Sequence, residues 1–252
     1  YRAQKHAIRD IVNVINAGCK SPDQAVWAVE GDIQGCFDNI SHRILLQKVW
    51  RMGIHDKRVL KIVSQMLKAG YIERDLYHQT ATGTPQGGIL SPLLSNIYLN
   101  DFDWYVGRTY MEPHRKCKHK CNDTRRLKWA GTTSKYNFRY ADDWVVLTST
   151  EKEAFRMKRE LTKYFRQKLK LELSQEKTYV TDLRKGGIHF LGYIVKAERK
   201  RKTPDPATWT EHLVGKPLPD MERLSKKIGN LLEQVHHIEL FSKPNTQAAQ
   251  IQ

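Results

Sequence analysis

Residues 136–148 read Tyr-Asn-Phe-Arg-Tyr-Ala-Asp-Asp-Trp-Val-Val-Leu-Thr. Two runs rich in aromatic and β-branched residues, Tyr136–Tyr140 and Trp144–Thr148, flank a tight Ala-Asp-Asp link, which predicts a β-hairpin. Its turn carries two adjacent carboxylates, Asp142 and Asp143. Adjacent like charges raise one another's pKa unless a cation neutralises them. Because two Asp residues are also ordinary turn formers, the pair alone is weak evidence of chemistry.

A third carboxylate follows another apolar run far upstream. Residues 25–29 read Ala-Val-Trp-Ala-Val and continue into Glu-Gly-Asp, so we expect Asp32 at the end of a strand. An ionised carboxylate that is buried there needs a counter-charge. If Asp32, Asp142 and Asp143 lie on neighbouring strand ends, their hard oxygens suit Mg²⁺. Two such ions can activate a 3′-hydroxyl and neutralise a phosphoryl transition state.

Helical and strand patterns are mixed along the rest of the chain. Ser91-Pro92 predicts a helix start, with Ser as the N-cap. Pro204, Pro206, Pro217 and Pro219 follow a basic stretch and are expected to break regular structure. This order predicts an α+β domain over residues 1–204, followed over residues 205–252 by a linker and the start of a helical element. Apolar spacing predicts helices near 1–17, 44–52, 56–68, 151–169 and 220–240, and strands at 178–181 and 189–195.

The composition points to a polyanionic partner. The 252 residues include 43 Lys and Arg against 27 Asp and Glu, a net charge of +16, and 40% are hydrophobic, which excludes a disordered basic tail. Nucleic acid is the first expectation for the partner, and an anionic membrane surface is the second. We find no apolar run of about 18 residues and no leader pattern, so we expect no membrane span and no secretion.

The four cysteines predict no disulfide framework. Cys19, Cys36, Cys117 and Cys121 are few and unevenly spaced, which favours a reducing compartment, and Cys36 is expected to be a small core residue. The histidines near the last pair suggest zinc, but the spacing is not that of two separated ligand pairs, and the lysines between them would repel a dication. We therefore interpret residues 114–128 as a mobile basic loop that contacts nucleic acid.

Four sequence blocks in this order resemble a reverse transcriptase. The long Pro-Gln-Gly-Gly-Ile-Leu-Ser-Pro form of the second block is similar to that of the group II intron-encoded reverse transcriptases, or maturases. The resemblance spans most of residues 1–195 and implies a right-hand polymerase palm, an antiparallel sheet backed by helices, with partial fingers and a truncated helical thumb. It also implies that the chain is a piece of a longer protein. The blocks are Asp32 to Asp38, Gly83 to Pro92, Tyr140 to Asp143, and Phe190 to Tyr193.

The resemblance assigns the metal site. Asp32 and Asp142 match the direct ligands of two Mg²⁺ ions, for which Mn²⁺ can substitute, and Asp143 matches the supporting carboxylate. The carbonyl of Ile33 matches a further oxygen ligand.

It also assigns residues around the incoming dNTP. Phe37 matches the steric gate that excludes a ribose 2′-hydroxyl, although on its own it would be taken as core. Gln86 and Gly87 match residues beside the nucleotide. Gly83, Gly87 and Gly88 are expected where another backbone or a ligand approaches closely; without the family they form a plain loop before a helix.

Two further assignments concern the leaving group and the primer. Lys177 matches a lysine that protonates the leaving pyrophosphate, and a solvated lysine at a strand edge is the equal alternative. A tight hairpin made of Phe190, Leu191, Gly192 and Tyr193 matches the primer grip, and it can equally be a strand pair that packs on the palm.

Basic residues outside these blocks are the weaker expectations for nucleic-acid contact. Arg2 looks like the remnant of a family block in which Ala3 replaces the usual Pro. The others lie in two basic segments that would contact phosphates without regard to sequence. They are Arg115, Lys116, Lys118, Lys120, Arg199, Lys200 and Arg201.

The resemblance implies an RNA-directed DNA polymerase that uses an RNA template, a DNA or RNA primer and dNTPs. It further implies a mobile-element maturase that binds its parent group II intron RNA to assist splicing. The alternatives are another prokaryotic reverse transcriptase such as a retron enzyme, a non-catalytic RNA-binding splicing factor on a polymerase scaffold, and a basic membrane-surface or DNA-binding domain. We expect a bacterial cytoplasmic or a eukaryotic organellar location, and the sequence leaves a homodimer open.

Overall fold

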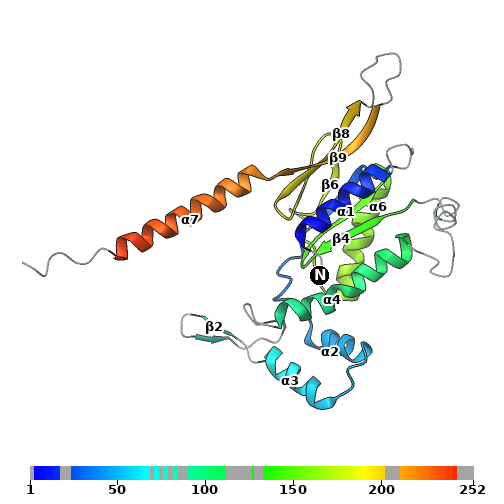
Figure 1. The fold of residues 1–252 in the computed structure, drawn as a ribbon. Coiled ribbons are helices and arrows are strands. Elements are labelled where there is room, and N and C mark those ends of the chain that lie inside the picture. Colours follow the sequence, from blue (N-terminus) through cyan, green and yellow to red (C-terminus); the bar gives the residue numbers. More distant parts are fainter. Residues whose placement is uncertain are drawn as a thin grey trace, which may run out of the picture.

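The computed structural model describes residues 3–17, 24–68, 71–73, 76–78, 82–84, 90–111, 127, 133–201 and 211–242 (Figure 1). No helix among these residues is both long and apolar enough to cross a membrane. The helices are α1 (Gln4–Ala17), α2 (His42–Arg51), α3 (Lys57–Lys68), α4 (Ser91–Val106), α6 (Glu151–Tyr164), α7 (Met221–Ser242) and two π-helical turns, η1 (Gly107–Met111) and η2 (Phe165–Leu169). The strands are β1 (Trp27–Gly31), β2 (Tyr71–Glu73), β3 (Leu76–His78), β4 (Tyr136–Tyr140), β5 (Asp143–Thr148), β6 (Tyr179–Asp182), β7 (Ile188–Phe190), β8 (Tyr193–Arg201) and β9 (Glu211–Pro219).

A four-stranded antiparallel sheet in the order β4-β5-β1-β6 forms the centre of the molecule. The hairpin predicted from residues 136–148 is confirmed as β4 and β5, with Tyr140 opposite Asp143. The strand predicted before Asp32 is confirmed as β1, and it pairs with β5 over its whole length from Trp27 to Gly31. The α+β class is therefore confirmed.

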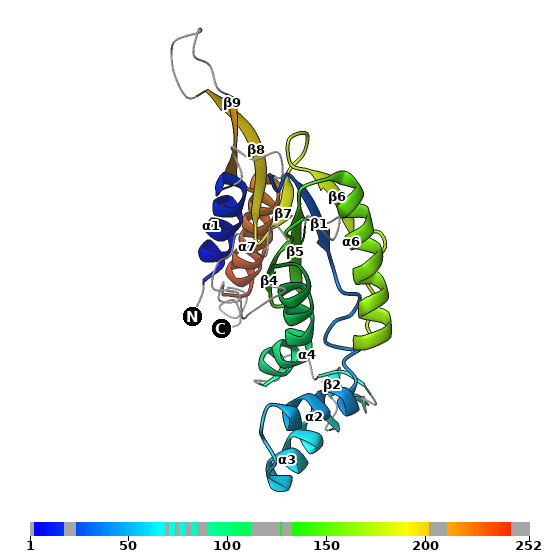
Figure 2. The ribbon, with the colours of Figure 1, turned by 90° about the vertical axis from the view of Figure 1, so that its right-hand side faces the viewer.

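The two faces of this sheet are covered by different elements. Because side chains alternate along a strand, Trp144 and Val146 point to one face and Val145 and Leu147 to the other. The first face packs against α2, α4 and α6 in one buried cluster. The second packs against α1 and the strands β7 and β8 in another. Figure 2 shows α6 and α1 on opposite sides of the sheet.

Besides the two-stranded β2-β3 sheet there is a three-stranded sheet of order β7-β8-β9, which corrects two expectations. The single strand expected at 189–195 is two strands joined by a tight turn, because Leu191 and Gly192 both have positive φ, 53° and 80°. The prolines at 217 and 219 do not break regular structure. They lie in β9 opposite Val195 and Tyr193. An edge strand tolerates proline because its outer N–H groups need no partner.

Helix boundaries differ from the sequence expectations in three places. The α-helix expected to run to residue 169 ends at Tyr164 and continues as the π-helical turn η2. Ser91 is already helical and the N-cap is Leu90, so the predicted serine cap is wrong, although Pro92 lies in the first turn as expected. The helices at 44–52 and 56–68 are confirmed as α2 and α3, with shifts of one or two residues.

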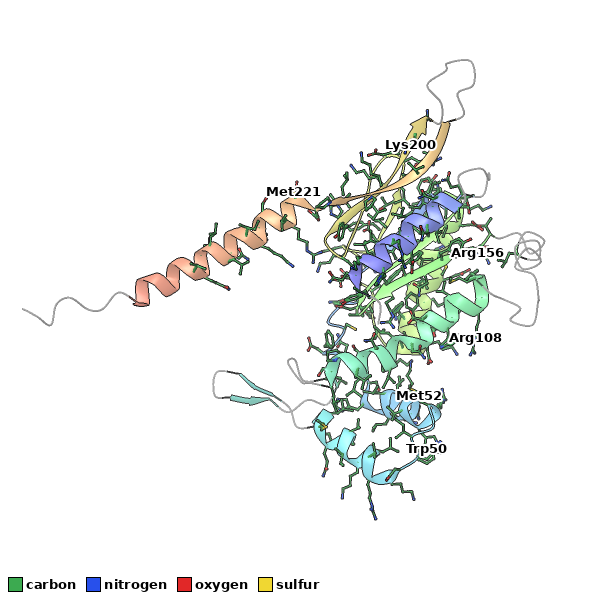
Figure 3. All side chains as sticks on the ribbon, viewed as in Figure 1. Trp50, Met52, Arg108, Arg156, Lys200 and Met221 are labelled. Atoms are coloured by element: carbon green, nitrogen blue, oxygen red, sulfur yellow. The ribbon has the colours of Figure 1, made fainter. Side chains whose placement is uncertain are left out.

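The helix α7 extends away from the central sheet and from the β7-β8-β9 sheet (Figures 1 and 3). Its apolar residues leave much of their surface exposed, from 44% at Leu224 to 64% at Leu232. The separate helix expected at 220–240 is therefore present, and its apolar stripe is not packed on the described part of the chain. The division at residues 204 and 205 stays a prediction.

Candidate active site

The strand register brings the three predicted carboxylates to one end of the central sheet. Gly31, the last residue of β1, lies opposite Trp144, the second residue of β5. Asp32 follows Gly31 directly, and Asp143 precedes Trp144. The carboxylates of Asp32 and Asp143 therefore lie side by side at the ends of the two strands. Asp142 occupies the β4–β5 turn next to them.

The carboxylates act on one another electrostatically. Desolvation is the first cause that raises the pKa of Asp143, followed by the negative charge of Asp142 and then of Asp32, while Arg223 of α7 opposes the rise. The buried thiol of Cys36 lies in the same field. Burial first, and then Asp142, raise its pKa to about 12. Cys36 is thus a core residue, as expected, packed beneath a cluster of negative charge.

A loop from the far side of the sheet brings a cation to Asp32. The amide of Ser174 donates to the Asp32 carbonyl at 2.9 Å, and the amide of Gln34 donates to Glu172 at 2.9 Å. These two hydrogen bonds form an isolated antiparallel β-bridge in which Ile33 lies opposite Leu173. Neither bond involves the Ile33 carbonyl.

Three residues beyond Ser174, the Lys177 amine lies 3.1 Å from Asp32 Oδ2, with 69% of the Lys177 side chain exposed. The predicted Lys177 is therefore in contact with a predicted metal ligand. This ion pair raises the pKa of the Lys177 amine.

The chemistry of this donor set fits Mg²⁺. The three carboxylates and the Ile33 carbonyl offer hard oxygens, and a dication would relieve the repulsion from Asp142 and Asp32 that adds to desolvation in raising the pKa of Asp143. Lys177 supplies part of that neutralisation at Asp32. Within the described residues, no three or more His, Cys, Asp and Glu side chains are gathered closely enough to hold an ion as they stand.

Arg139 fixes the turn that carries Asp142, and sequence reasoning missed it. Its guanidinium donates to the Ala141 carbonyl at 2.7 Å, and its Nε and Nη2 atoms pair with both oxygens of Asp103 on α4 at 3.0 and 2.6 Å. Asn96 accepts a further bond at 2.8 Å. Ala141 has a φ of 57°, a conformation that costs a non-glycine residue energy and needs such support. The only sequence signal was an arginine inside a strand that is otherwise mostly aromatic.

Gly31 and Trp144 form a second fixed point that the sequence analysis overlooked. A Cβ atom on Gly31 would lie 2.2 Å from the Trp144 ring, so the indole occupies the space of the missing side chain. Trp144 is 1% exposed and packs edge-on against Phe102. This contact sets the register of the strand ends that carry Asp32 and Asp143. The signal available was a glycine directly before one Asp and a tryptophan directly after another.

The segment 82–84 docks on the turn that contains Phe37. Gly83 has a φ of 93°, and a Cβ there would lie 2.7 Å from the Asp38 carbonyl, so the close backbone approach predicted for Gly83 is confirmed. The Thr84 amide donates to the Phe37 carbonyl at 2.7 Å. Phe37 itself is half-buried. The predicted nucleotide-binding residues Gln86 and Gly87, with Gly88, lie outside the described residues.

The predicted primer-grip hairpin is tied to the start of α7. The turn at Leu191 and Gly192 joins Phe190 to Tyr193, and the Gly192 carbonyl accepts the Asp220 amide at 3.0 Å. Asp220 also accepts from the Arg223 amide at 3.1 Å and lies 2.9 Å from the His189 ring. The hydrogen bond with His189 is the first cause that lowers the pKa of the Asp220 carboxyl.

The remaining basic residues divide into two groups. Arg199 and Lys200 lie on β8, in the long β8–β9 hairpin at one end of the molecule (Figure 3). Arg201 ends that strand. Arg2, Arg115, Lys116, Lys118 and Lys120, like Cys117 and Cys121, lie outside the described residues.

Comparison with known proteins decides the family. The model of the family described as "Reverse transcriptase (RNA-dependent DNA polymerase)" matches residues 2–195. The chain belongs to the reverse transcriptase family. It is 36% identical over 215 residues to the group II intron-encoded protein LtrA of Lactococcus lactis, covering 69% of this chain and 36% of LtrA. It is 33% identical to protein YkfC of Escherichia coli, covering 79% of this chain and 54% of YkfC.

Solved structures agree on the fold. The apo telomerase of Candida tropicalis, truncated of its C-terminal domain, superposes with a TM-score of 0.54 at 14% identity, over 78% of this chain and 39% of that one. The expected polymerase palm, an antiparallel sheet backed by helices, is therefore confirmed. This reverse transcriptase chain spans about a third to a half of the length of the relatives named above.

Proposed function

We propose that the chain is the catalytic part of an RNA-directed DNA polymerase. It adds dNTPs to the 3′ end of a DNA or RNA primer on an RNA template and releases pyrophosphate. The observation that carries this proposal is the meeting of Asp32 with Asp142 and Asp143 at adjacent strand ends, in a chain of the reverse transcriptase family. A purely structural sheet end gains nothing from three neighbouring carboxylates, because their repulsion is unfavourable.

Asp32 and Asp142 would hold two Mg²⁺ ions through their carboxylates, with Asp143 in support and the Ile33 carbonyl as a further oxygen. When bound, the metal supplies positive charge that activates the primer hydroxyl and neutralises the phosphoryl transition state. The protein's own contribution is positioning, which can account for several kcal/mol of a barrier. Arg139 holds the turn of Asp142, and the contact of Gly31 with Trp144 holds the strand ends together.

Two further residues would act on the nucleotide. The Phe37 ring would exclude a ribose 2′-hydroxyl and so favour dNTPs over rNTPs. Lys177 would donate a proton to the leaving pyrophosphate. The amine carries a proton at neutral pH, and its pairing with Asp32 raises its pKa further, so the proton would be released to pyrophosphate only once Asp32 binds metal instead.

A maturase function is the second proposal, and it rests on a separate observation. Relatives that match most of this chain are named as proteins encoded by introns, in Lactococcus lactis and in the yeast Saccharomyces cerevisiae. The net charge of +16 is suited to binding a large structured RNA. We propose that the intact protein binds its parent intron RNA and assists its splicing.

The test is extension of a DNA primer on poly(rA), with and without Mg²⁺. The intact protein is compared with the Asp142→Asn/Asp143→Asn variant and with Asp56→Asn/Glu151→Gln. The control variant removes the same charge from exposed residues, and Asn can still cap α3 at position 56.

We expect Mg²⁺-dependent synthesis by the wild type and the control variant, and none by the Asp142→Asn/Asp143→Asn variant. If all three proteins bind structured RNA tightly and none extends the primer, the polymerase proposal fails and a splicing factor on a polymerase scaffold remains.

A further inference from the structure

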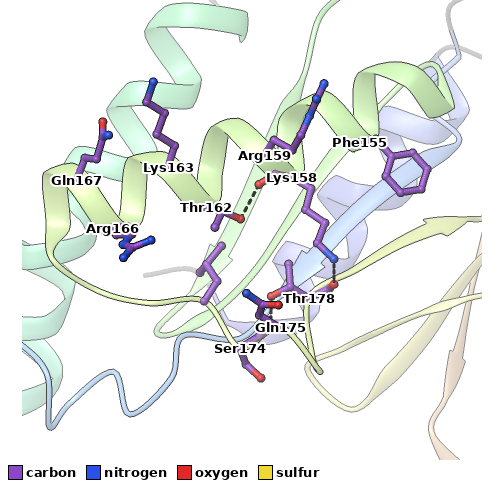
Figure 4. Close-up of a pocket in the computed structure, with 11 residues that line it drawn as sticks. Phe155, Lys158, Arg159, Thr162, Lys163, Arg166, Gln167, Ser174, Gln175 and Thr178 are labelled. Carbon is purple, nitrogen blue, oxygen red and sulfur yellow. Dashed lines mark hydrogen bonds between the residues drawn. The ribbon is translucent and has the colours of Figure 1, made fainter.

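A basic groove lies beside α6, on the face of the palm opposite to the side chain of Asp143, and its wall residue Ser174 also donates to the Asp32 carbonyl. It has a volume of about 800 Å³ and runs between α6 and residues 173–178 (Figure 4). Asp143 alternates with Trp144 along β5, so its side chain points to the face that carries Val145 and Leu147. That face packs against α1 and β7, whereas α6 covers the opposite face. An occupant of the groove would therefore lie on the other face of the central sheet from the Asp143 carboxylate.

The charge of the groove selects an anion. Four basic side chains line it, and none of the described lining residues is acidic. Lys158 is held in place because its amine donates to the Thr178 carbonyl at 2.6 Å. Arg166 makes a long contact of 3.9 Å with Glu172, and both side chains are mostly exposed. An incoming phosphate can therefore take the place of Glu172 beside Arg166. Arg159 and Lys163 are exposed at the rim.

The shape and the aromatic content of the groove select a strand of nucleotides over a single phosphate compound. Phe155 begins the row on α6, with 51% of its surface exposed, and Arg166 ends it. The eleven helical steps from Phe155 to Arg166 rise about 16 Å, a length suited to several nucleotides. An exposed aromatic ring beside a row of cations is the pattern by which proteins stack bases and contact the backbone of single strands. Figure 4 shows Lys158 reaching from α6 to Thr178, whereas the Arg159 and Lys163 side chains extend from α6 away from residues 173–178.

We propose that this groove is a second RNA site, which binds a short single-stranded segment by stacking a base on Phe155 and pairing phosphates with Arg159, Lys163 and Arg166. The identity of the strand as RNA rests on the proposed function. The site itself needs no polymerase activity. A segment of a structured RNA held here could stay bound while the opposite face copies a template.

The binding test uses the intact protein and a fluorescein-labelled oligo(rU) of about 12 nucleotides. An unlabelled primer–template duplex is added in excess to fill the catalytic side. Anisotropy is measured over a range of KCl concentrations for Arg159→Glu/Lys163→Glu, Phe155→Ala and Phe155→Trp. The matched control is Lys168→Glu/Lys185→Glu, which changes the charge equally at exposed lysines that do not line the groove.

We expect Arg159→Glu/Lys163→Glu to lose two phosphate contacts, so that the slope of log K against log salt becomes shallower by about 1.4. Phe155→Ala should weaken binding about fivefold or more with an unchanged slope, and Phe155→Trp should restore it. The control should match the wild type. If Arg159→Glu/Lys163→Glu binds like the control, or both weaken alike, the groove is not an RNA site.

Primer extension by the same preparations separates this proposal from the polymerase proposal. Because the groove variants change exposed side chains, they should fold and extend poly(rA)-templated primers at the wild-type rate. If the groove variants lose oligo(rU) binding and the wild type synthesises no DNA, the groove proposal is supported and the polymerase proposal fails. If the wild type synthesises DNA normally and every variant binds oligo(rU) like the wild type, the polymerase proposal is supported and the groove proposal fails.

Discussion

The turn that carries Asp142 and the loop that carries Lys177 meet at the same site, but they are fastened in different ways. The turn is held by Arg139, whose side chain is only 10% exposed and bonds to three other residues. The Lys177 side chain is 69% exposed, and its amine bonds to Asp32. The contrast indicates that the two segments have different roles. The turn sets the position of the carboxylates, and Lys177 is a charge that can be exchanged as the site fills.

The largest effect on primer extension is expected for a substitution of Gly31, at the strand end that carries Asp32. In Gly31→Ala the new methyl group meets the Trp144 ring, and since overpacking of a core costs about 1–3 kcal/mol, the strand ends must shift. A displacement of about 1 Å can lower the rate about 100-fold, so we expect primer extension to fall by that order. Gly186→Ala is the control, because its nearest neighbour would lie 3.7 Å away. Equal activity of the two variants would show that the indole contact does not set the site.

A smaller effect should follow at Arg139. Arg139→Lys keeps the charge but cannot pair with both oxygens of Asp103 while also reaching the Ala141 carbonyl. We expect kcat to fall about tenfold and the KM for dNTP to stay within about twofold, because the residue positions the turn and does not bind the nucleotide. Arg156→Lys, at the exposed pair with Glu160, is the matched control. A change confined to KM would contradict the positioning role.

The sequence could predict whatever depends on short-range pattern. The alternation of residues 136–148 predicted β4 and β5, and an apolar strand that ends in Asp predicted β1. The close approach at Gly83 was expected from the resemblance to the reverse transcriptases, because only glycine fits where another backbone comes near. In the first two cases the pattern that predicts the element lies within a single strand or hairpin.

Contacts between distant segments were not predictable in this way. Arg139 meets Asp103 across 36 positions, and no spacing rule links them. Pro217 and Pro219 suggested a linker because their role as an edge strand depends on β8, to which β9 pairs. The end of α6 at Tyr164 follows from the π-helical turn at 165–169, where the spacing of apolar residues continues without a break.

At the exposed Lys177, the substitution Lys177→Gln should change primer-extension activity by only a few fold. Exposed ion pairs contribute about 0–1 kcal/mol, so the free energy of unfolding should not change measurably. If Lys177 donates a proton to pyrophosphate, kcat falls and the high-pH limb of the rate profile is lost. If it only neutralises Asp32, kcat is kept and the apparent affinity for Mg²⁺ rises, because a competing cation has been removed. The pH profile of kcat and the Mg²⁺ titration separate the two roles.

The smallest effect should be on the stability of the metal-free protein. The folded protein raises the pKa of Asp143, so the native state holds the proton more tightly, and this contribution to stability is lost as the pH rises from the unfolded pKa through the folded one. Asp143→Asn removes the ionisable group and should raise Tm in EDTA at neutral pH. The gain should be only about 1 °C, because the side chain is exposed and solvent screens the repulsion. It should disappear at a pH below the unfolded pKa, where both proteins are neutral at this position. It should also reverse when Mg²⁺ is added, because the dication turns the repulsion among the carboxylates into a favourable interaction that the variant lacks. A gain that persists at acid pH would mean that Asn packs better than Asp at this turn, and that the ionised carboxylate of Asp143 is not the source of the gain.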